Sequence, residues 1–257
     1  MKVIISERLE EPIKFEGLKE LESELERESS DLKVKIMNVQ AEVDGWVSLE
    51  YEGEDSEIFT ETLRRRYGFA PAQTPRISLG ETYKGFIKDS GRAGENICID
   101  IGIIHPKRKY CFYPASRLRA QLADGSPEPV KSILEMFCLQ EGLPLRIRVE
   151  RVEGSGRICV ALTDRQEETL KRWRVTPPDR IIVIGAVPSR ISEAIGEARL
   201  EWDIINVVRL SLTASVLECR LGRRVEDIVS RLRPRLPKST LKTLVSTRGF
   251  EQETGSL

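Results

Sequence analysis

Cationic and aromatic side chains alternate along one short stretch of the chain, residues 82–88. If this stretch is a β-strand, Lys84, Phe86 and Lys88 point to the same face, opposite Tyr83. Ammonium groups bind phosphates, and an exposed aromatic ring stacks on a nucleic-acid base with about 1–3 kcal/mol. The pattern indicates a surface for single-stranded RNA, unless the ring packs beneath a neighbouring domain.

A second strand, predicted at residues 145–152, carries arginines in a similar arrangement. Arg146 and Arg148 alternate with aliphatic residues, so both guanidinium groups lie on one face of the strand. Guanidinium groups bind phosphate with two parallel hydrogen bonds. The alternative interpretation is a solvated barrel face without a nucleic-acid ligand.

A third group of cations begins just before a strand predicted at residues 109–113. Lys107, Arg108 and Lys109 add three positive charges, and Phe112 is a second candidate for base stacking. Cations beside an exposed aromatic ring suit a groove that follows a nucleic-acid backbone. If Phe112 instead packs under a neighbouring domain, this interpretation fails.

A fourth group of cations lies on a helix predicted at residues 223–236. Apolar residues at helical spacing form one face, and Arg224, Arg231 and Arg235 share the other at spacings of seven and four. An arginine-rich helix face can contact phosphates. It can equally be a solubilising surface, and the sequence leaves both interpretations open.

Side chains that build catalytic or metal sites are sparse. The only histidine, His105, has no nearby carboxylate, and each of the five cysteines is more than ten residues from the next. A zinc site needs close pairs of Cys or His, and the glycine motifs that bind phosphate and the nucleophile elbow are missing. We therefore predict no enzyme activity, no metal and no cofactor.

The charges are balanced over the whole chain but unevenly distributed along it. Basic and acidic residues number 41 each, yet the net charge is −8 over residues 1–70, +3 over 71–164 and +7 over 165–250. The phosphates of nucleic acid should repel the first segment. Its predicted partner is a basic protein surface, either ribosomal or the C-terminal segment of a second copy, which would form a homo-oligomer.

Membrane association is not indicated. No apolar run approaches the roughly 18 residues that cross a bilayer. The N-terminus turns acidic at Glu7 and has no signal-peptide hydrophobic region. We expect a cytoplasmic protein.

The order of predicted elements divides this α+β chain into three domains. Residues 1–74 and 178–250 each show the order β-α-β-β-α-β, which is typical of ferredoxin-like domains, with a strand near residues 75–79 closing the first. Residues 76–172 contain five short strands and one helix, which is typical of a small OB barrel. The prediction is an acidic ferredoxin-like domain, a central barrel and a basic ferredoxin-like domain.

Five runs within the central segment resemble the ribosomal S-one type of OB fold and follow its order. They are Gly80–Ile87, Ile99–Gly102, Cys111–Leu118, Gly142–Val149 and Arg157–Leu162. The whole chain also resembles an archaeal protein family of unknown function. The first resemblance implies that single-stranded RNA crosses the second and third strands of the barrel, where aromatic and histidine side chains stack on bases.

Two positions depart from the S-one pattern, because Cys98 replaces a usual phenylalanine and Pro114 replaces a frequent histidine. The leading hypothesis is a non-enzymatic RNA-binding or ribosome-associated protein that uses the barrel face and the basic C-terminal helix. The alternative is a protein-interaction or assembly module whose barrel has lost RNA binding.

Overall fold

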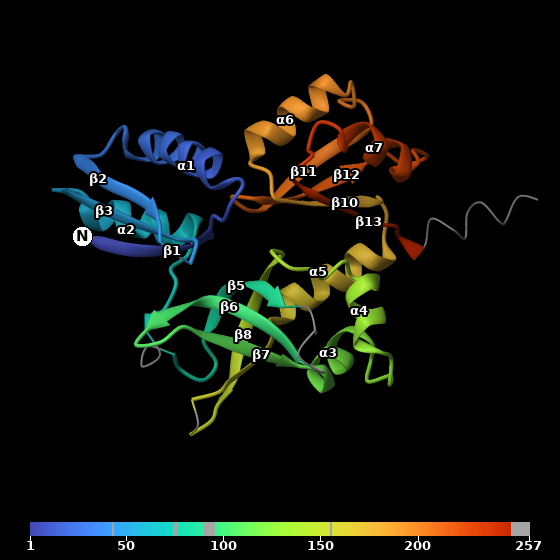
Figure 1. The fold of residues 1–257 in the computed structure, drawn as a ribbon, viewed down its shortest axis with the longest axis horizontal. Helices are drawn as coiled ribbons and strands as arrows, with labels where there is room; N and C mark the ends of the chain where they lie inside the picture. Colours follow the sequence, from blue (N-terminus) through green and yellow to red (C-terminus); the bar gives the residue numbers. More distant parts are fainter. Residues whose placement is uncertain (43, 74–76, 90–95, 155, 248–257) are drawn as a thin grey trace, which may run out of the picture.

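The computed structural model describes residues 1–42, 44–73, 77–89, 96–154 and 156–247. The chain has a mixed α+β fold with three sheets, and each sheet is the centre of one packed unit (Figure 1). We call these the N-terminal unit (β1 to α2), the barrel unit (β4 to α5) and the C-terminal unit (β10 to β13). In Figure 1 the first and last units lie side by side above the barrel unit.

The N-terminal unit is a three-stranded antiparallel sheet in the order β1-β3-β2, with two helices packed against it. Leucines at helical spacing explain the first helix, since Leu21 and Leu25 are fully buried. The elements are β1 (Lys2–Arg8), α1 (Lys14–Ser29), β2 (Val34–Ala41), β3 (Trp46–Gly53) and α2 (Ser56–Arg66).

The barrel unit contains a closed five-stranded barrel in the order β6-β5-β8-β9-β7, in which β7 pairs back with β6. Strand alternation puts every second residue into its core, for example Ile97, Ile99 and Ile101. The elements are β4 (Ala72–Gln73), β5 (Thr82–Asp89), β6 (Asn96–His105), β7 (Lys109–Pro114), α3 (Ala115–Leu122), α4 (Val130–Met136), β8 (Pro144–Val152), β9 (Ile158–Leu162) and α5 (Asp164–Val175).

The strand predicted to close the N-terminal sheet does not do so. Residues 77–79 are not in a strand, and residues 74–76 lie outside the described ranges. The short β4 instead pairs in parallel with β6. The reason is that the chain turns at Gly68, where φ is +76°, touches β1 through a single bridge between Ile5 and Phe69, and then passes to the barrel.

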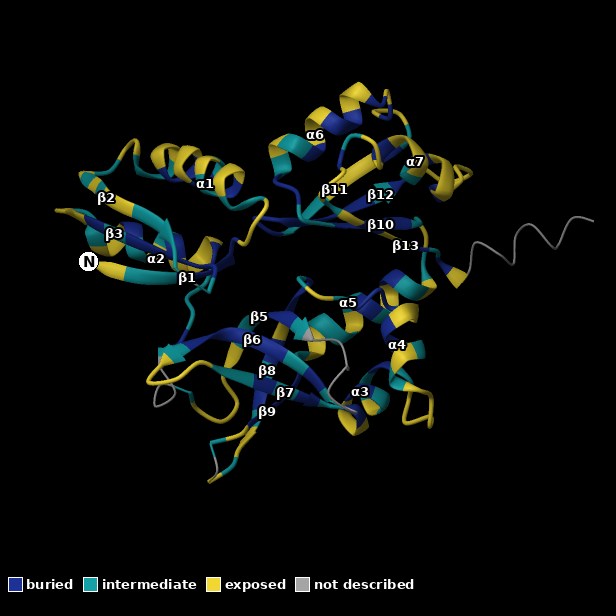
Figure 2. Cartoon of the chain, viewed as in Figure 1, coloured by how far each residue is buried: buried dark blue, intermediate teal, exposed yellow. Residues whose placement is uncertain are grey.

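The C-terminal unit is an antiparallel sheet in the order β11-β12-β10-β13. Its middle strand β10 includes three consecutive apolar residues, Ile181, Ile182 and Val183, and all are fully buried (Figure 2). Ile181 and Val183 pack with α6 and α7, whereas Ile182 packs with the barrel core. The elements are β10 (Arg180–Ile184), α6 (Pro188–Glu197), β11 (Ile204–Ser211), β12 (Ala214–Cys219), α7 (Val225–Leu232) and β13 (Thr240–Leu244).

The predicted domain limits at residues 74, 76 and 250 fall outside the described ranges. The limit at 172 falls inside α5, which continues to Val175. The separability of the three units as domains stays a prediction. None of the described helices has both the length and the apolar composition needed to cross a membrane.

Candidate nucleic-acid interface

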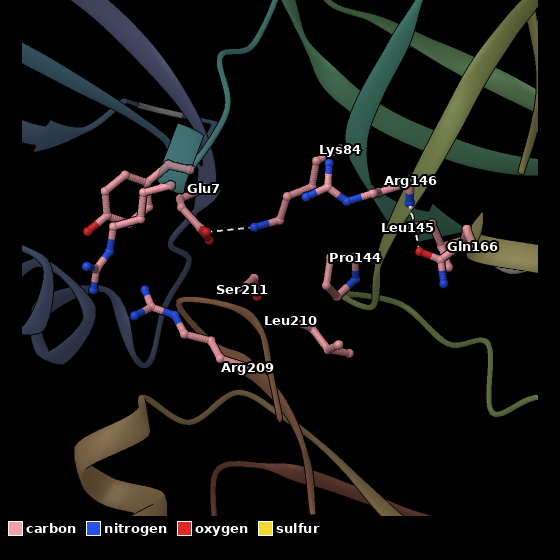
Figure 3. Close-up of a pocket in the computed structure, with 11 residues that line it drawn as sticks. Glu7, Lys84, Pro144, Leu145, Arg146, Gln166, Arg209, Leu210 and Ser211 are labelled. Carbon is pink, nitrogen blue, oxygen red and sulfur yellow. Dashed lines mark hydrogen bonds and ion pairs between the residues drawn. The ribbon is translucent and has the colours of Figure 1, made fainter. Parts of the chain in front are cut away.

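A cleft of about 430 Å³ lies where the three units meet (Figure 3). The N-terminal unit and the adjoining Tyr67 form one wall, β5, β8 and α5 form a second, and β11 forms the third. We call it the junction cleft. Its lining residues are Glu7, Arg66, Tyr67, Lys84, Pro144, Leu145, Arg146, Gln166, Arg209, Leu210 and Ser211.

The barrel wall of the junction cleft comes from two neighbouring strands. Lys84 of β5 is directly opposite Arg146 of β8 in the antiparallel register, and Thr82 is opposite Arg148. Leu145 and Ile147 are buried in the barrel, Arg146 is exposed and Arg148 is half-buried. The predicted alternation of β8 is therefore confirmed, and it brings two cations side by side.

The walls carry four cations, and buried carboxylates partly neutralise three of them. The Lys84 ammonium lies 2.6 Å from Glu7, whose second oxygen accepts a hydrogen bond from the Leu212 backbone N–H at 2.8 Å. Arg66 and Arg209 both pair with Glu24, at 3.4 and 2.5 Å. The acidic N-terminal unit thus uses its charge to bind cations of the same chain.

Two guanidinium groups of the junction cleft have N–H donors that no acceptor of the described residues satisfies. Among the described residues, Arg146 forms no ion pair, and its backbone N–H donates to the Gln166 side chain at 3.1 Å. Nη2 of Arg209 is buried and has no hydrogen-bond partner within the described ranges. An unsatisfied buried donor costs roughly 1–3 kcal/mol. The missing groups are hydrogen-bond acceptors, and phosphate oxygens are the acceptors that guanidinium groups bind best.

Acidification should weaken the contact between the N-terminal and C-terminal units. Burial favours a higher pKa for Glu24, but the hydrogen bonds from Arg209 and Tyr67 and the charge of Arg66 outweigh it and lower the pKa. Such a carboxyl stabilises the fold above its unfolded pKa of roughly 4.3 and loses this effect as pH falls through its lowered folded pKa. Urea unfolding midpoints measured between pH 7 and pH 3 should therefore fall more steeply for the wild type than for Glu24→Gln. If the urea midpoints of the wild type and of Glu24→Gln fall equally with pH, the prediction is contradicted.

The expectation that Lys84, Phe86 and Lys88 form an open face is wrong, because the N-terminal unit covers them. The Phe86 ring is 2% exposed and makes an edge-to-face contact with Trp46, at 5.7 Å between ring centroids. Lys88 lies 3.4 Å from Glu10 and 3.5 Å from Glu141. Phe86 cannot stack on a base in this arrangement, and of the three only Lys84 lines the junction cleft.

The loop before β7 and Phe112 lie away from the junction cleft. Lys107 is exposed and Lys109 is half-buried, while Arg108 donates to the buried Asp100 carboxylate at 2.8 Å. The Phe112 ring is half-buried, and the Arg157 guanidinium covers it at 4.5 Å from the centroid. Arg108 is thus committed to a structural contact, and the other three residues remain candidates for RNA contact.

The predicted arginine face of α7 is mostly engaged with its own unit. Arg231 lies 3.5 Å from Asp203 and donates to the last carbonyl groups of the α6 segment, at Ala198 and Arg199. Arg235 lies 3.9 Å from Glu197. Only Arg224, just before the first helical residue, is exposed without an ion pair among the described residues. The expected open row of three guanidinium groups is therefore wrong.

Sequence reasoning missed Arg66 and Arg209, which line the junction cleft. Arg66 ends α2 within the run Arg64 to Arg66, in the segment with the strongest negative charge. Arg209 is the one charged residue of the largely apolar edge strand β11. A lone cation inside an apolar strand is a usable signal of a buried ion pair, because it needs a carboxylate partner.

Two buried cysteine thiols, those of Cys111 and Cys219, are poor nucleophiles. Burial raises the pKa of Cys111 and of Cys219 to about 12. Thiols with such values stay protonated at neutral pH, and the thiolate is the reactive form. Among the described residues, no three His, Cys, Asp or Glu side chains gather as a metal site.

The sheets and the junction cleft define an α+β protein with a closed five-stranded barrel. Two family models match it: the DUF2110 N-terminal domain at residues 8–73 and the DUF2110 central domain at residues 77–174. Together they cover more than half of the chain, which therefore belongs to the DUF2110 family. A search of curated proteins found no match.

Two solved structures are similar to parts of the chain. The intact alpha subunit of aIF2 from Pyrococcus abyssi is 12% identical, with 65% of this chain and 97% of that chain covered and a TM-score of 0.25. A candidate RNA-binding protein of the exosome complex is 11% identical, with coverages of 63% and 83% and a TM-score of 0.24.

Proposed function

We propose that this protein is a non-enzymatic RNA-binding protein and that the junction cleft is the centre of its RNA-binding surface. One observation carries the proposal: Arg66, Lys84, Arg146 and Arg209 come from all three units and line one cleft. Among the described residues, three carboxylates contact these four cations, those of Glu7, Glu24 and Glu28. The excess positive charge on the walls of the junction cleft favours binding of a phosphate backbone.

The barrel supports this proposal through its strand order. β5 pairs with β6 and β8, β7 pairs with β6, and β9 pairs in parallel with β7. This closure supports a Greek-key OB barrel, a fold that binds oligonucleotides. We infer that the barrel is an OB barrel of the S-one type, and that the two flanking units are variants of the ferredoxin-like plan. The N-terminal unit is an incomplete variant, because its described sheet has three strands.

The RNA-binding surface extends from the junction cleft along β8. Arg146 is exposed at the cleft, and Arg148 is the next outward residue, 39% exposed and 3.4 Å from Asp164. The half-buried Phe112 beneath Arg157 offers the stacking contact that the covered Phe86 cannot. The partner that we propose is RNA or the ribosome, with a cytoplasmic location.

Reversing the charge of Arg146 should weaken RNA binding. We expect Arg146→Glu to lower affinity for a single-stranded oligonucleotide at least about tenfold and to reduce the salt dependence by about one phosphate contact. Fluorescence anisotropy at two salt concentrations measures both quantities. The matched control is Lys131→Glu, because Lys131 of α4 is 86% exposed and does not line the cleft.

Equal losses in Arg146→Glu and Lys131→Glu would show that only net charge matters and would contradict the assignment of the cleft. Absence of RNA binding by the wild type would overturn the proposed function. That result would favour an assembly module. Exposed apolar residues near the edge strand β11 support this alternative: Trp202 is 76% exposed, Ile205 is 55% exposed and Leu221 is 71% exposed. The backbone hydrogen bond from Arg220 to Asp203, at 2.7 Å, holds the segments of Trp202 and Leu221 together.

A further inference from the structure

The size of the junction cleft limits what it can hold. About 430 Å³ lies near the lower end of the roughly 300–1,000 Å³ that small-molecule sites occupy. An extended strand of the roughly 4–16 nucleotides that an OB fold binds needs a groove far larger than this. The cleft has room for one small unit of a ligand rather than for a run of the backbone.

The polar groups of the cleft are arranged for an oxyanion. Lys84 and Arg146 are cross-strand neighbours with like charges, which is unfavourable without a shared counterion. Glu7 neutralises one of them, and Arg146 has no ion pair among the described residues. Across the cleft, Arg209 holds a buried donor, Nη2, for which the described part of the chain provides no acceptor (Figure 3). An anion that accepts several hydrogen bonds satisfies these requirements together.

The cleft also has an apolar side, which a bare phosphate would leave uncovered. Pro144 and Leu145 are buried at the start of β8, and Leu210 of β11 is half-buried beside them. All three line the cleft next to the cations. The combination of apolar contacts and a cationic rim suits a ligand with a flat organic part joined to a phosphate.

From this chemistry we propose that the junction cleft binds one nucleoside monophosphate unit, with its phosphate between Arg146 and Arg209 and its base or ribose against Leu210 and Pro144. The unit comes either from a free nucleotide or from the 5′-phosphorylated end of an RNA strand. This proposal rests on the proposed RNA-binding function for its ligand class. It assigns the cleft to a single nucleotide rather than to the interior of a strand.

The test is a calorimetric titration of the full chain at low salt with three probes: uridine 5′-monophosphate, uridine and inorganic phosphate. We expect saturable binding of the monophosphate and at least tenfold weaker binding of the other two. Arg146→Ala should weaken binding of the monophosphate about tenfold. Lys131→Ala should leave it unchanged, because Lys131 is exposed on α4.

Three results would overturn the proposal: no binding of the monophosphate, equal binding of inorganic phosphate, or equal monophosphate affinity in wild type and Arg146→Ala.

Competition distinguishes the two sources of the nucleotide. Displacement of the monophosphate by a 5′-phosphorylated oligonucleotide, but not by its 5′-hydroxyl form, identifies a strand end, and no displacement by either identifies a free nucleotide. RNA binding without monophosphate binding overturns this proposal alone, whereas monophosphate binding without RNA binding overturns the proposed function alone.

Discussion

Replacing Asp100 with alanine should lower the free energy of unfolding by about 3–5 kcal/mol, the range found when one member of a buried ion pair is removed. Asp100 is 1% exposed and lies on β6, where the barrel contacts the N-terminal unit. Its carboxylate accepts hydrogen bonds from the Trp46 indole at 3.2 Å, from the Gly102 N–H at 3.0 Å and from Arg108 at 2.8 Å. Alanine leaves all three donors without this acceptor.

The cost is large because a second cation is buried beside this carboxylate. The Arg8 side chain is 5% exposed, and its Nε lies 3.9 Å from Asp100. The contact is also tightly packed: a Cβ added at Gly102 would lie 2.6 Å from the Cβ of Ala70 and 3.1 Å from the Trp46 ring. Water therefore has little room to replace the lost oxygen atoms.

Urea denaturation followed by tryptophan fluorescence measures this effect, with Trp46 reporting directly from the contact. Asp100→Asn should lower the free energy of unfolding less than Asp100→Ala does, because the amide oxygen of asparagine can still accept hydrogen bonds from Trp46 and Gly102. The matched control is Glu193→Ala, which removes a 63% exposed carboxylate paired with Arg190 and should cost at most about 1 kcal/mol. The prediction is wrong if the two alanine variants are equally stable.

Replacing Glu7 with alanine is expected to have a similar effect, about 3–5 kcal/mol, for a different reason. Glu7 belongs to the N-terminal unit, binds Lys84 of the barrel unit and accepts from the N–H of Leu212 in the C-terminal unit. One carboxylate therefore joins all three units. Its loss leaves Lys84, 12% exposed, without its counterion.

This variant should also loosen the relative placement of the units. We expect a larger radius of gyration by small-angle X-ray scattering, together with the lower unfolding midpoint. Glu54→Ala is the control, because Glu54 is 76% exposed and pairs with Lys33 within the same unit. A variant at Glu7 that is as compact and as stable as Glu54→Ala would show that apolar packing alone holds the units together.

The alternation of apolar and polar residues predicted the direction of side chains but not their surroundings. In β8 the prediction placed Arg146 outside the barrel, where the structure has it. In β5 the same reasoning put Phe86 outside the barrel, but the outside of this strand is the interface with Trp46. Local periodicity reports one face of one sheet, and what covers that face depends on residues far away in the sequence.

Some of the missing information was present in other patterns. The consecutive apolar residues Ile181 to Val183 break the alternation expected for a half-exposed strand, and such runs occur where both faces of a sheet are buried. α5 was missed because its only buried side chains are Leu170 and Trp173, so the apolar period is short. The pairing of Arg231 with Asp203 joins the start of β11 to α7, and no local pattern predicts such a contact.

Because the lining residues of the junction cleft come from all three units, the cleft forms late in the synthesis of the chain. The ribosome releases Glu7 and Arg66 first, then Lys84 and Arg146, and Arg209 last. A nascent chain that ends after α5 has the barrel but lacks the third wall, and the barrel residues that meet Ile182 are uncovered. If the proposed function holds, ligand binding at the cleft requires that the C-terminal sheet has emerged and docked. The site that we propose then exists only after all three units have folded together.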